Sequence, residues 1–194
     1  MRWQRVREAF NQSLDAVSLR IWRWDHRCLE YIHQQPKLKR ASKLFVTFTY
    51  FGDGYLWLAV LVGLSVFGTS SDRRRALIMV IITSLNIVMF RISKRLAKRI
   101  RPDSPAAVAL RFRYLDSYSF PSGHATTAFG MATMLSGFYP FAPVQIAAFS
   151  AAALISFSRI YVGEHYPSDV LIGAALGVLV SSLLLPVFEY LLLG

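Results

Sequence analysis

Cysteine is nearly absent from this sequence, and acidic residues are scarce. The chain of 194 residues contains one cysteine, Cys28, and 11 Asp and Glu residues against 22 Lys and Arg residues. A lone cysteine excludes an internal disulfide framework. The few acidic residues do not cluster as an oxygen-ligand site for a metal ion requires, so we expect no metal and no other cofactor.

Apolar residues are abundant instead. They make up 54% of the chain, and the mean hydropathy of +0.39 is too high for a typical soluble domain. The composition therefore indicates an integral membrane protein. The net charge of +11 would suit nucleic acid or an acidic surface. With this hydropathy, anionic lipid headgroups and an anionic substrate are the better partners, and we expect no nucleic-acid partner.

Long apolar runs predict the fold class. We expect an all-α polytopic membrane bundle whose helices can cross a hydrocarbon core of roughly 30 Å. The five predicted membrane helices cover residues 44–69, 76–92, 122–139, 144–160 and 168–191. Residues 44–194 would then form a single transmembrane domain. The basic N-terminus is not followed by a short apolar core with a cleavage site, so we expect no signal peptide.

Residues 1–43 carry ten Lys and Arg residues, which are too many charges to span lipid. Leu14, Val17 and Ile21 recur at helical spacing, which predicts an amphipathic helix with a basic face. We expect this segment to lie on the headgroups with its tryptophans at the membrane boundary. The alternative is a solvated basic helix that packs on other helices.

Two polar interruptions mark the first half of the membrane domain. Asp53, between Gly52 and Gly54, falls near the start of the first apolar run. This carboxylate could cap the helix or take part in catalysis, and the cap is the preferred interpretation. Residues 70–75 end in three arginines and are predicted to form a short charged connection between the first two membrane helices.

Three polar clusters fall on one predicted membrane face, because five single crossings place residues 93–119, 158–168 and the N-terminus on the same side. The first cluster holds Lys94 and Arg101, seven residues apart. They would project from nearly one side of a helix that Pro102 then ends. Such a cation pair suits an oxyanion, and a positive flank of a membrane helix is the alternative.

The second cluster is the run from Phe120 to His124, immediately before an apolar helix. Proline, Ser122 and Gly123 at a helix start leave several N–H groups pointing outward, with the positive end of the helix dipole behind them. This arrangement predicts an anion site with His124 beside it. The alternative is a histidine that only satisfies the helix end, and the adjacent Ser-Gly pair favours the anion site.

The third cluster runs from Ser158 to Asp169 and joins the last two apolar helices. Charged groups at a membrane boundary tend to have a partner or a function. Asp169 follows His165 by four residues, so its carboxylate could accept the Nδ1–H of the imidazole and leave Nε2 free to attack. An ordinary structural hydrogen bond at a helix start is the alternative for this pair.

Taken together, the clusters place three cations, an N–H donor site, two histidines and one aspartate on one face. That combination predicts phosphoryl transfer. Cations and N–H groups would hold the phosphate oxygens, His165 would attack phosphorus in line, and His124 would protonate the leaving oxygen.

The spacing of these residues resembles the three-part signature of the type 2 phosphatidic acid phosphatase family, whose site is shared with vanadium haloperoxidases. Six residues separate Lys94 from Arg101-Pro102, and Pro121-Ser122-Gly123-His124 follows. Five residues then separate Ser158-Arg159 from His165, and three more separate His165 from Asp169. The match is complete in order and spacing over roughly residues 85–190. A helical, magnesium-independent membrane phosphatase of lipid phosphates is what this resemblance implies.

The resemblance also implies a role for each site residue. His165 would form a phosphohistidine, Asp169 would orient it, and His124 would be the general acid. The residues implied to bind phosphate are Lys94, Arg101, Ser122, Gly123 and Arg159. Three alternatives stay open: a phosphotransferase that uses the same site, a vanadate-dependent oxidase, and a non-catalytic lipid-binding scaffold.

The sequence indicates a class of substrate and a side of the membrane for the active site. Polyprenyl phosphate or diphosphate, phosphatidylglycerol phosphate and phosphatidate all fit an interfacial headgroup with a tail in lipid. The motif face carries 19 Lys and Arg residues against three on the other face. The excess of positive charge predicts a cytoplasmic active site in a bacterial-type inner membrane, with a periplasmic site as the alternative.

Overall fold

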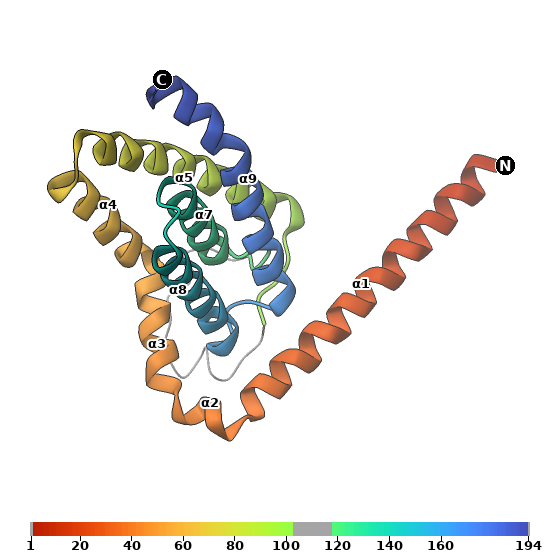
Figure 1. The fold of residues 1–194 in the computed structure, drawn as a ribbon. Coiled ribbons are helices and arrows are strands. Elements are labelled where there is room, and N and C mark those ends of the chain that lie inside the picture. The colour runs from red at the N-terminus through yellow and green to blue at the C-terminus, as the bar shows by residue number, and fades with distance from the viewer. Residues whose placement is uncertain (1, 103–117, 194) are drawn as a thin grey trace.

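The helical bundle is built around one short central helix, α7 (Figure 1). The structure, a computed structural model, describes residues 2–102 and 118–193. Every regular element in these two ranges is a helix, which confirms the predicted all-α fold. The elements in chain order are α1 (Arg2–Gln34), α2 (Pro36–Arg40), α3 (Ser42–Tyr50), the π-helical turn η1 (Phe51–Tyr55), α4 (Leu56–Phe67), α5 (Ser70–Ala97), α7 (Gly123–Phe138), α8 (Ala142–Tyr161) and α9 (Pro167–Leu193).

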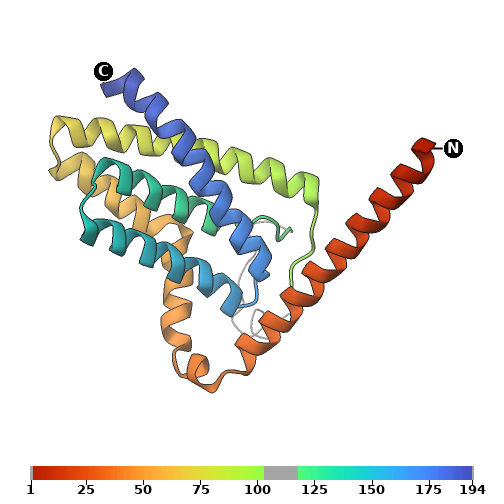
Figure 2. The same ribbon diagram turned by 45° about the vertical axis from the view of Figure 1, so that its right-hand side comes forward.

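Four helical stretches within the described residues are long and apolar enough to cross a membrane, whereas five were predicted. They are Ser42–Phe67, which α3, η1 and α4 form in succession, and Ser70–Ala97, Ala142–Tyr161 and Pro167–Leu193. The difference is α7, which has 16 residues. At 1.5 Å per residue such a helix is roughly 24 Å long. It packs against α5, α8 and α9, which surround it in Figure 2.

Two glycines allow α9 to approach α7 very closely. A Cβ atom on Gly177 would lie 2.1 Å from the carbonyl oxygen of Thr126, and one on Gly173 would lie 2.5 Å from the carbonyl oxygen of Ser122. Small residues are what permit such backbone contact between membrane helices. The backbone N–H of Ser122 also donates to the carbonyl oxygen of Asp169 at 2.9 Å. The beginnings of α7 and α9, which carry two of the predicted clusters, are therefore held together.

Helix α5 begins earlier than predicted. Thr69 caps it, because its hydroxyl accepts from the N–H of Asp72 while the Asp72 carboxylate accepts from the N–H of Thr69. This reciprocal capping box satisfies two N–H groups at the helix start. The predicted connection over residues 70–75 is therefore wrong, because those residues form the first turns of α5.

Helix α5 runs past the predicted bound of residue 92 but ends before Pro102, where its extension was predicted to stop. It stops at Ala97, and Lys98 adopts a left-handed backbone conformation with φ of 49°. Arg101 consequently lies beyond the helix, and Pro102 does not end it. A backbone bridge between Ile100 and Tyr118 follows this turn. Most of the remaining polar stretch predicted over residues 93–119 lies outside the described residues.

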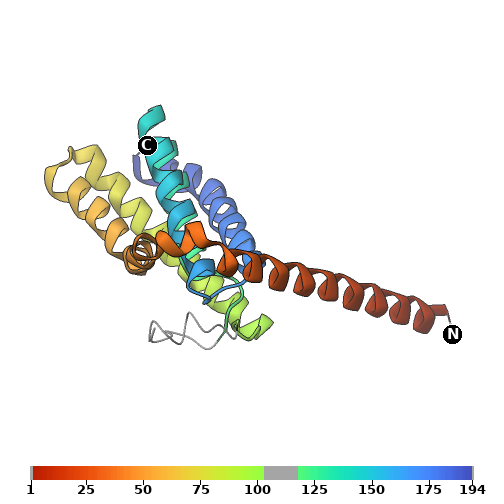
Figure 3. The ribbon, with the colours of Figure 1, turned by 90° about the horizontal axis from the view of Figure 1, so that it is seen from below.

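Helix α1 extends far beyond the bundle, as the view from below shows (Figure 3). Its C-terminal half packs on α8 and α9. There Leu29 joins a small buried cluster with Ile160, Tyr166 and Val170. Trp22 and Trp24 on the same helix remain exposed.

Candidate active site

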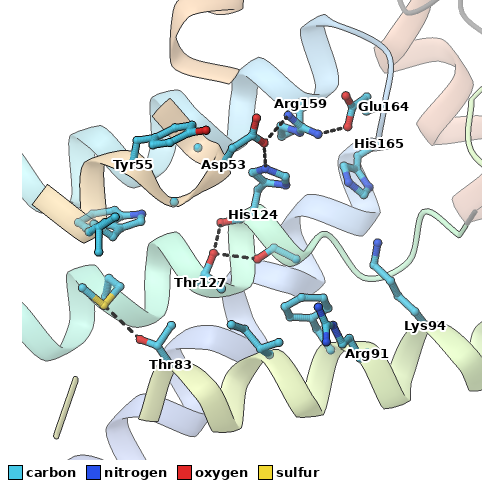
Figure 4. Close-up of a pocket in the computed structure, with 18 of the residues that line it drawn as sticks. Asp53, Tyr55, Thr83, Arg91, Lys94, His124, Thr127, Arg159, Glu164 and His165 are labelled. Atoms are coloured by element: carbon cyan, nitrogen blue, oxygen red, sulfur yellow. Dashed lines mark hydrogen bonds and ion pairs between the residues drawn. The ribbon is translucent and has the colours of Figure 1, made fainter. Parts of the chain in front are cut away.

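A cavity of about 890 Å³ lies between η1, α4, α5, α7 and the end of α8. Figure 4 shows His124, Arg159 and His165 on one side of it and Lys94 extending toward them from α5. The charged and histidine side chains that line it, which we call its polar end, are Asp53, Arg91, Lys94, Arg95, Arg101, His124, Arg159, Glu164 and His165. The apolar side chains are Trp57, Leu58, Leu61, Ile87, Phe90 and Met131.

All three predicted clusters contribute to this cavity. Of the eight predicted site residues, Ser122 and Asp169 do not line it. The six that do are Lys94, Arg101, Gly123, His124, Arg159 and His165. Residues more than 60 positions apart in the sequence thus meet at one polar surface.

The cations reach the cavity from different elements. Lys94 comes from the last turn of α5 and is buried, and its Nζ donates to the carbonyl oxygen of Tyr118 at 2.9 Å. Arg101 follows the end of α5, and Arg159 belongs to the last turn of α8. The helix geometry predicted for Lys94 and Arg101 is therefore wrong, although both side chains reach the same cavity.

Glu164 is a site residue that the sequence analysis missed. Its carboxylate is buried and forms ion pairs with Arg159 and, at 3.5 Å, with Arg101. The Arg101 guanidinium also donates to the Glu164 carbonyl oxygen at 2.9 Å. One carboxylate therefore joins two of the three predicted phosphate-binding cations. A signal was available, since an acid next to His165 at a membrane boundary needs a partner.

The start of α7 presents its backbone to the cavity. Ser122 is the N-cap and its hydroxyl accepts from the N–H of Ala125 at 3.5 Å, which leaves this buried side chain behind the cavity wall. Gly123 lines the cavity, and a Cβ there would lie 2.9 Å from the ring of Phe90. Glycine at this position therefore allows Phe90 of α5 to pack against the helix start, whose backbone N–H groups are the kind that bind anions.

Asp53 does not cap a helix, so the preferred interpretation of this residue is wrong. Helix α4 has Tyr55 as its N-cap, without a side-chain hydrogen bond. The Asp53 carboxylate instead lies 2.8 Å from Nε2 of His124 and 3.9 Å from Nη1 of Arg159. The π-helical turn η1, in which Gly54 has φ of 108°, carries Asp53 into the cavity. The sequence pattern gives no sign of this π-turn, which is why the contact was missed.

His165 and Asp169 lie close together but not at hydrogen-bond distance. Nδ1 of His165 is 3.8 Å from the Asp169 carboxylate, and it has no hydrogen-bond partner in the described structure. Burial, followed by the charges of Arg101 and Lys94, holds the pKa of His165 well below its usual range. The ring is therefore neutral near pH 7, with a lone pair available for attack.

Asp169 has other partners. Its carboxylate accepts from Nη1 of Arg99 at 2.7 Å and from the backbone N–H of Tyr166 at 2.8 Å. Arg99 was not among the site residues predicted from the sequence. Its contact with Asp169 depends on the turn after α5, which the sequence pattern did not reveal.

The geometry agrees with what is found by comparison with known proteins. Residues 75–192, more than half of the chain, match the PAP2 superfamily. The chain belongs to the PAP2 superfamily. It is similar to an undecaprenyl-diphosphatase from Sulfolobus acidocaldarius, with 32% identity over 76% of this chain and 70% of that protein. It is also similar to a decaprenylphosphoryl-5-phosphoribose phosphatase from Mycobacterium tuberculosis, with 42% identity over 46% of this chain and 48% of that protein. The chain thus matches about half the length of that relative.

The fold of this PAP2 chain resembles two solved structures. A transmembrane PAP2 type phosphatidylglycerolphosphate phosphatase from Bacillus subtilis has a TM-score of 0.69 and 26% identity, covering 88% of this chain and 87% of the other. LpxE from Aquifex aeolicus has a TM-score of 0.64 and 27% identity, covering 82% of this chain and 93% of the other. With four helices able to cross a membrane and this likeness, the chain is a multi-pass membrane protein.

Several site groups lie outside the part that matches the PAP2 superfamily. Asp53, Trp57 and Leu58 belong to η1 and α4, which precede residue 75. They form one wall of the cavity and supply the carboxylate partner of His124. The described residues contain no group of three or more His, Cys, Asp or Glu side chains arranged to hold a metal ion.

Proposed function

We propose that this PAP2 chain is a lipid phosphate phosphatase that works through a phosphohistidine on His165. The observation that carries the proposal is one cavity that brings two histidines together with Lys94, Arg101 and Arg159 and that is also lined by several apolar side chains. The charged end suits a phosphate group, and the apolar surface suits the first part of a lipid tail.

In the first proposed step, Lys94, Arg101 and Arg159 bind the phosphate oxygens together with the N–H groups at Gly123. The Nε2 lone pair of His165 forms a bond to phosphorus while the bond from phosphorus to the lipid oxygen breaks. His124 transfers its proton to that leaving oxygen.

In the second proposed step, a water molecule attacks phosphorus and gives its proton to His124. The bond between phosphorus and His165 breaks, and inorganic phosphate leaves. The negative charge of Asp169, 3.8 Å from Nδ1, stabilises the positive charge on the His165 ring in both steps. Ser122 acts indirectly in this proposal, because it caps the helix whose N–H groups face the anion. The scheme uses no metal ion, since the three cations neutralise the phosphate.

We place polyprenyl phosphates and diphosphates first among the substrates, ahead of phosphatidylglycerol phosphate and phosphatidate. Two similar proteins are named for polyprenyl substrates, an undecaprenyl-diphosphatase and a decaprenylphosphoryl-5-phosphoribose phosphatase. Aromatic and branched side chains such as Trp57, Leu58 and Phe90 line the cavity and would contact an isoprenoid chain.

A substrate panel tests the proposal. Purified chain in lipid nanodiscs is expected to release phosphate from polyprenyl diphosphate faster than from phosphatidylglycerol phosphate or phosphatidate. Phosphate release and mass spectrometry of the lipid products are measured in the absence of added metal. Phosphate that appears on an added alcohol instead of in solution would identify a phosphotransferase. Absence of release from every lipid would contradict the proposed function.

We also propose a membrane arrangement. Helix α7 is the fifth membrane-embedded helix, residues 1–43 form a basic interfacial segment, and residues 44–194 form the transmembrane phosphatase domain. Exposed Trp22 and Trp24 beside the arginines of α1 support contact with anionic headgroups. The active site faces the cytoplasm in this arrangement, because the positive charge is concentrated on its side.

Cysteine labelling tests the orientation. In a Cys28→Ala background, Ile100→Cys places a thiol near the active-site face and Arg74→Cys places one at the opposite end of α5, and both native side chains are exposed. An impermeant thiol reagent added to intact spheroplasts is expected to label Arg74→Cys, and to label Ile100→Cys only after lysis. The reverse pattern would put the active site on the periplasmic face.

A further inference from the structure

Asp25 is a buried carboxylate on α1 that the proposed reaction does not use. It is 0% exposed. It accepts three hydrogen bonds, from the backbone N–H of Ser168 at 2.9 Å, from the Ser168 hydroxyl at 2.6 Å and from Nη2 of Arg99 at 2.6 Å. A buried carboxylate with this many partners is an ordered, specific contact. It joins α1 to the first turn of α9, where Asp169 lies.

Arg99 connects Asp25 to the catalytic cluster. Its Nη2 donates to Asp25, and its Nη1 donates to Asp169 at 2.7 Å. The guanidinium also lies 4.2 Å from the centre of the Tyr166 ring, which fixes its plane. One cation is thus shared between two fully buried carboxylates, of which one is 3.8 Å from Nδ1 of His165.

A second contact ties α1 to the other end of the same loop. The His33 imidazole Nε2 lies 3.0 Å from the carbonyl oxygen of Tyr161, the last residue of α8. Asp25 binds Ser168, just inside α9. The two contacts therefore flank residues 162–167, the loop that presents Glu164 and His165 to the cavity.

Because Asp25 and Asp169 share Arg99, the cluster of these three side chains is not electrically neutral. A guanidinium paired only with Asp169 would neutralise that carboxylate, whereas the trio of Asp25, Arg99 and Asp169 keeps one net negative charge. In a buried site with low dielectric, that charge acts strongly on the nearby imidazole. It favours the positive charge that develops on the ring as His165 attacks phosphorus.

We propose that Asp25 is a positioning residue for the His165 step, acting through Arg99 to keep the Asp169 carboxylate charged and fixed beside the imidazole. The N-terminal helix, which lies outside the part that matches the PAP2 superfamily, thereby contributes to the active site. The inference rests on the proposed function of His165.

Other charges also act on His165, and the test must keep them constant. They come from every element packed around the ring. The groups are Lys94 of α5, Arg99 and Arg101 after α5, His124 of α7, Arg159 of α8, Glu164 of the loop and Asp169 of α9. A substitution at Asp25 leaves all of these side chains in place.

The test compares Asp25→Asn with Asp15→Asn, the same change at an exposed position of the same helix. The side-chain oxygen of asparagine in Asp25→Asn can still accept from the Ser168 N–H, so this contact between α1 and α9 is kept while the charge is removed. We expect kcat to fall about 10- to 100-fold, by analogy with the loss seen when outer-shell partners of metal-bound histidines are removed. KM should change little, because no phosphate-binding group is altered. Asp15→Asn should match the wild type.

The pH profile separates positioning from mere loosening of the structure. When Asp25 loses its charge, Arg99 neutralises Asp169 more fully, protonation of His165 becomes harder, and its pKa falls. The acid limb of kcat/KM should then move to lower pH. If Asp25 only anchors α1 to the loop, the substitution loosens the loop and admits water around His165. The pKa of His165 then rises toward its usual value, and the acid limb of kcat/KM moves to higher pH. An acid limb that does not shift or that moves to higher pH, or an unchanged kcat, overturns the inference.

A second measurement does not depend on activity. NMR titration of histidine-labelled protein, with the His165 signal assigned from His165→Ala, should show the same shift to lower pH in Asp25→Asn and none in Asp15→Asn. If the wild type hydrolyses no lipid phosphate, the proposed function fails while this titration still tests the coupling. If the wild type is active and the His165 titration is unchanged in Asp25→Asn, the coupling fails and the proposed function stands.

Discussion

His165→Asn is expected to abolish phosphate release, with a loss of at least about 1,000-fold relative to wild type. Removal of a nucleophile that forms a covalent intermediate eliminates the pathway, and the residual rate comes from substrate binding alone. Asparagine cannot attack phosphorus but has a similar size, so the buried site should stay folded. The measurement is phosphate release from the best lipid of the panel, made on nanodisc samples with matched thermal unfolding curves.

The covalent intermediate provides a direct readout of the same variant. Rapid acid-free denaturation of the wild type with radiolabelled substrate should trap label on the protein in a form that is lost in acid and stable in base. His165→Asn should trap none. His26→Gln, a histidine change on α1 outside the cavity, serves as the matched control and should retain both label and activity. Trapping or turnover by His165→Asn would contradict the assignment of the nucleophile.

His124→Ala should lower the rate with a lipid phosphate by about 100- to 10,000-fold, the usual contribution of a general acid. In His124→Ala, the loss of rate in the first step should depend on the leaving group. A nitrophenyl phosphate needs little protonation of its leaving oxygen, so the variant should give a stoichiometric burst of nitrophenolate followed by slow turnover. Stopped-flow absorbance measures the burst. Equal losses in the first turnover with both substrates would contradict the role of His124 as the acid.

Asp53 provides an internal check on that role. Its carboxylate lies 2.8 Å from Nε2 of His124, so it stabilises the protonated ring. Asp53→Asn should show the same dependence on the leaving group with a loss of about 10-fold. In the double variant with His124→Ala, the change at Asp53 should add little, because a group that acts through His124 has no effect once His124 is absent.

The sequence was most informative where chemistry depends on residue type and spacing. The three clusters meet in one cavity because α7 packs against α5, α8 and α9, and the ends of these helices that carry the clusters lie together. The beginnings of the last three helices were predicted within two residues, since Ser122 and Pro167 are strong start signals. The chain's membership of the PAP2 superfamily also confirms the resemblance on which the roles were based.

The contacts that the sequence did not reveal depend on irregular backbone or on long-range packing. Asp53 reaches His124 through a π-helical turn, which has no periodic pattern. Arg99 reaches Asp169 because α5 ends at Ala97 in a left-handed turn, although Lys98 and Arg99 suit continued helix. Pairing of Asp25 with Ser168 joins residues 143 positions apart, and no local signal specifies such a contact.

The wall of the cavity formed by η1 and α4 comes from a different part of the chain than the groups proposed to react with the phosphate. The groups proposed to break the phosphate bond lie in residues 75–192, whereas Trp57, Leu58 and Leu61 precede that range. Exchanging residues 56–61 between relatives, with Asp53 kept, would therefore alter which tails fit without disturbing the nucleophile, its cations or the carboxylate beside His124. In this architecture the apolar wall that α4 supplies can change while Asp25, Asp53 and the groups proposed to hydrolyse the phosphate ester stay in place, so the choice among lipids can vary through α4 alone.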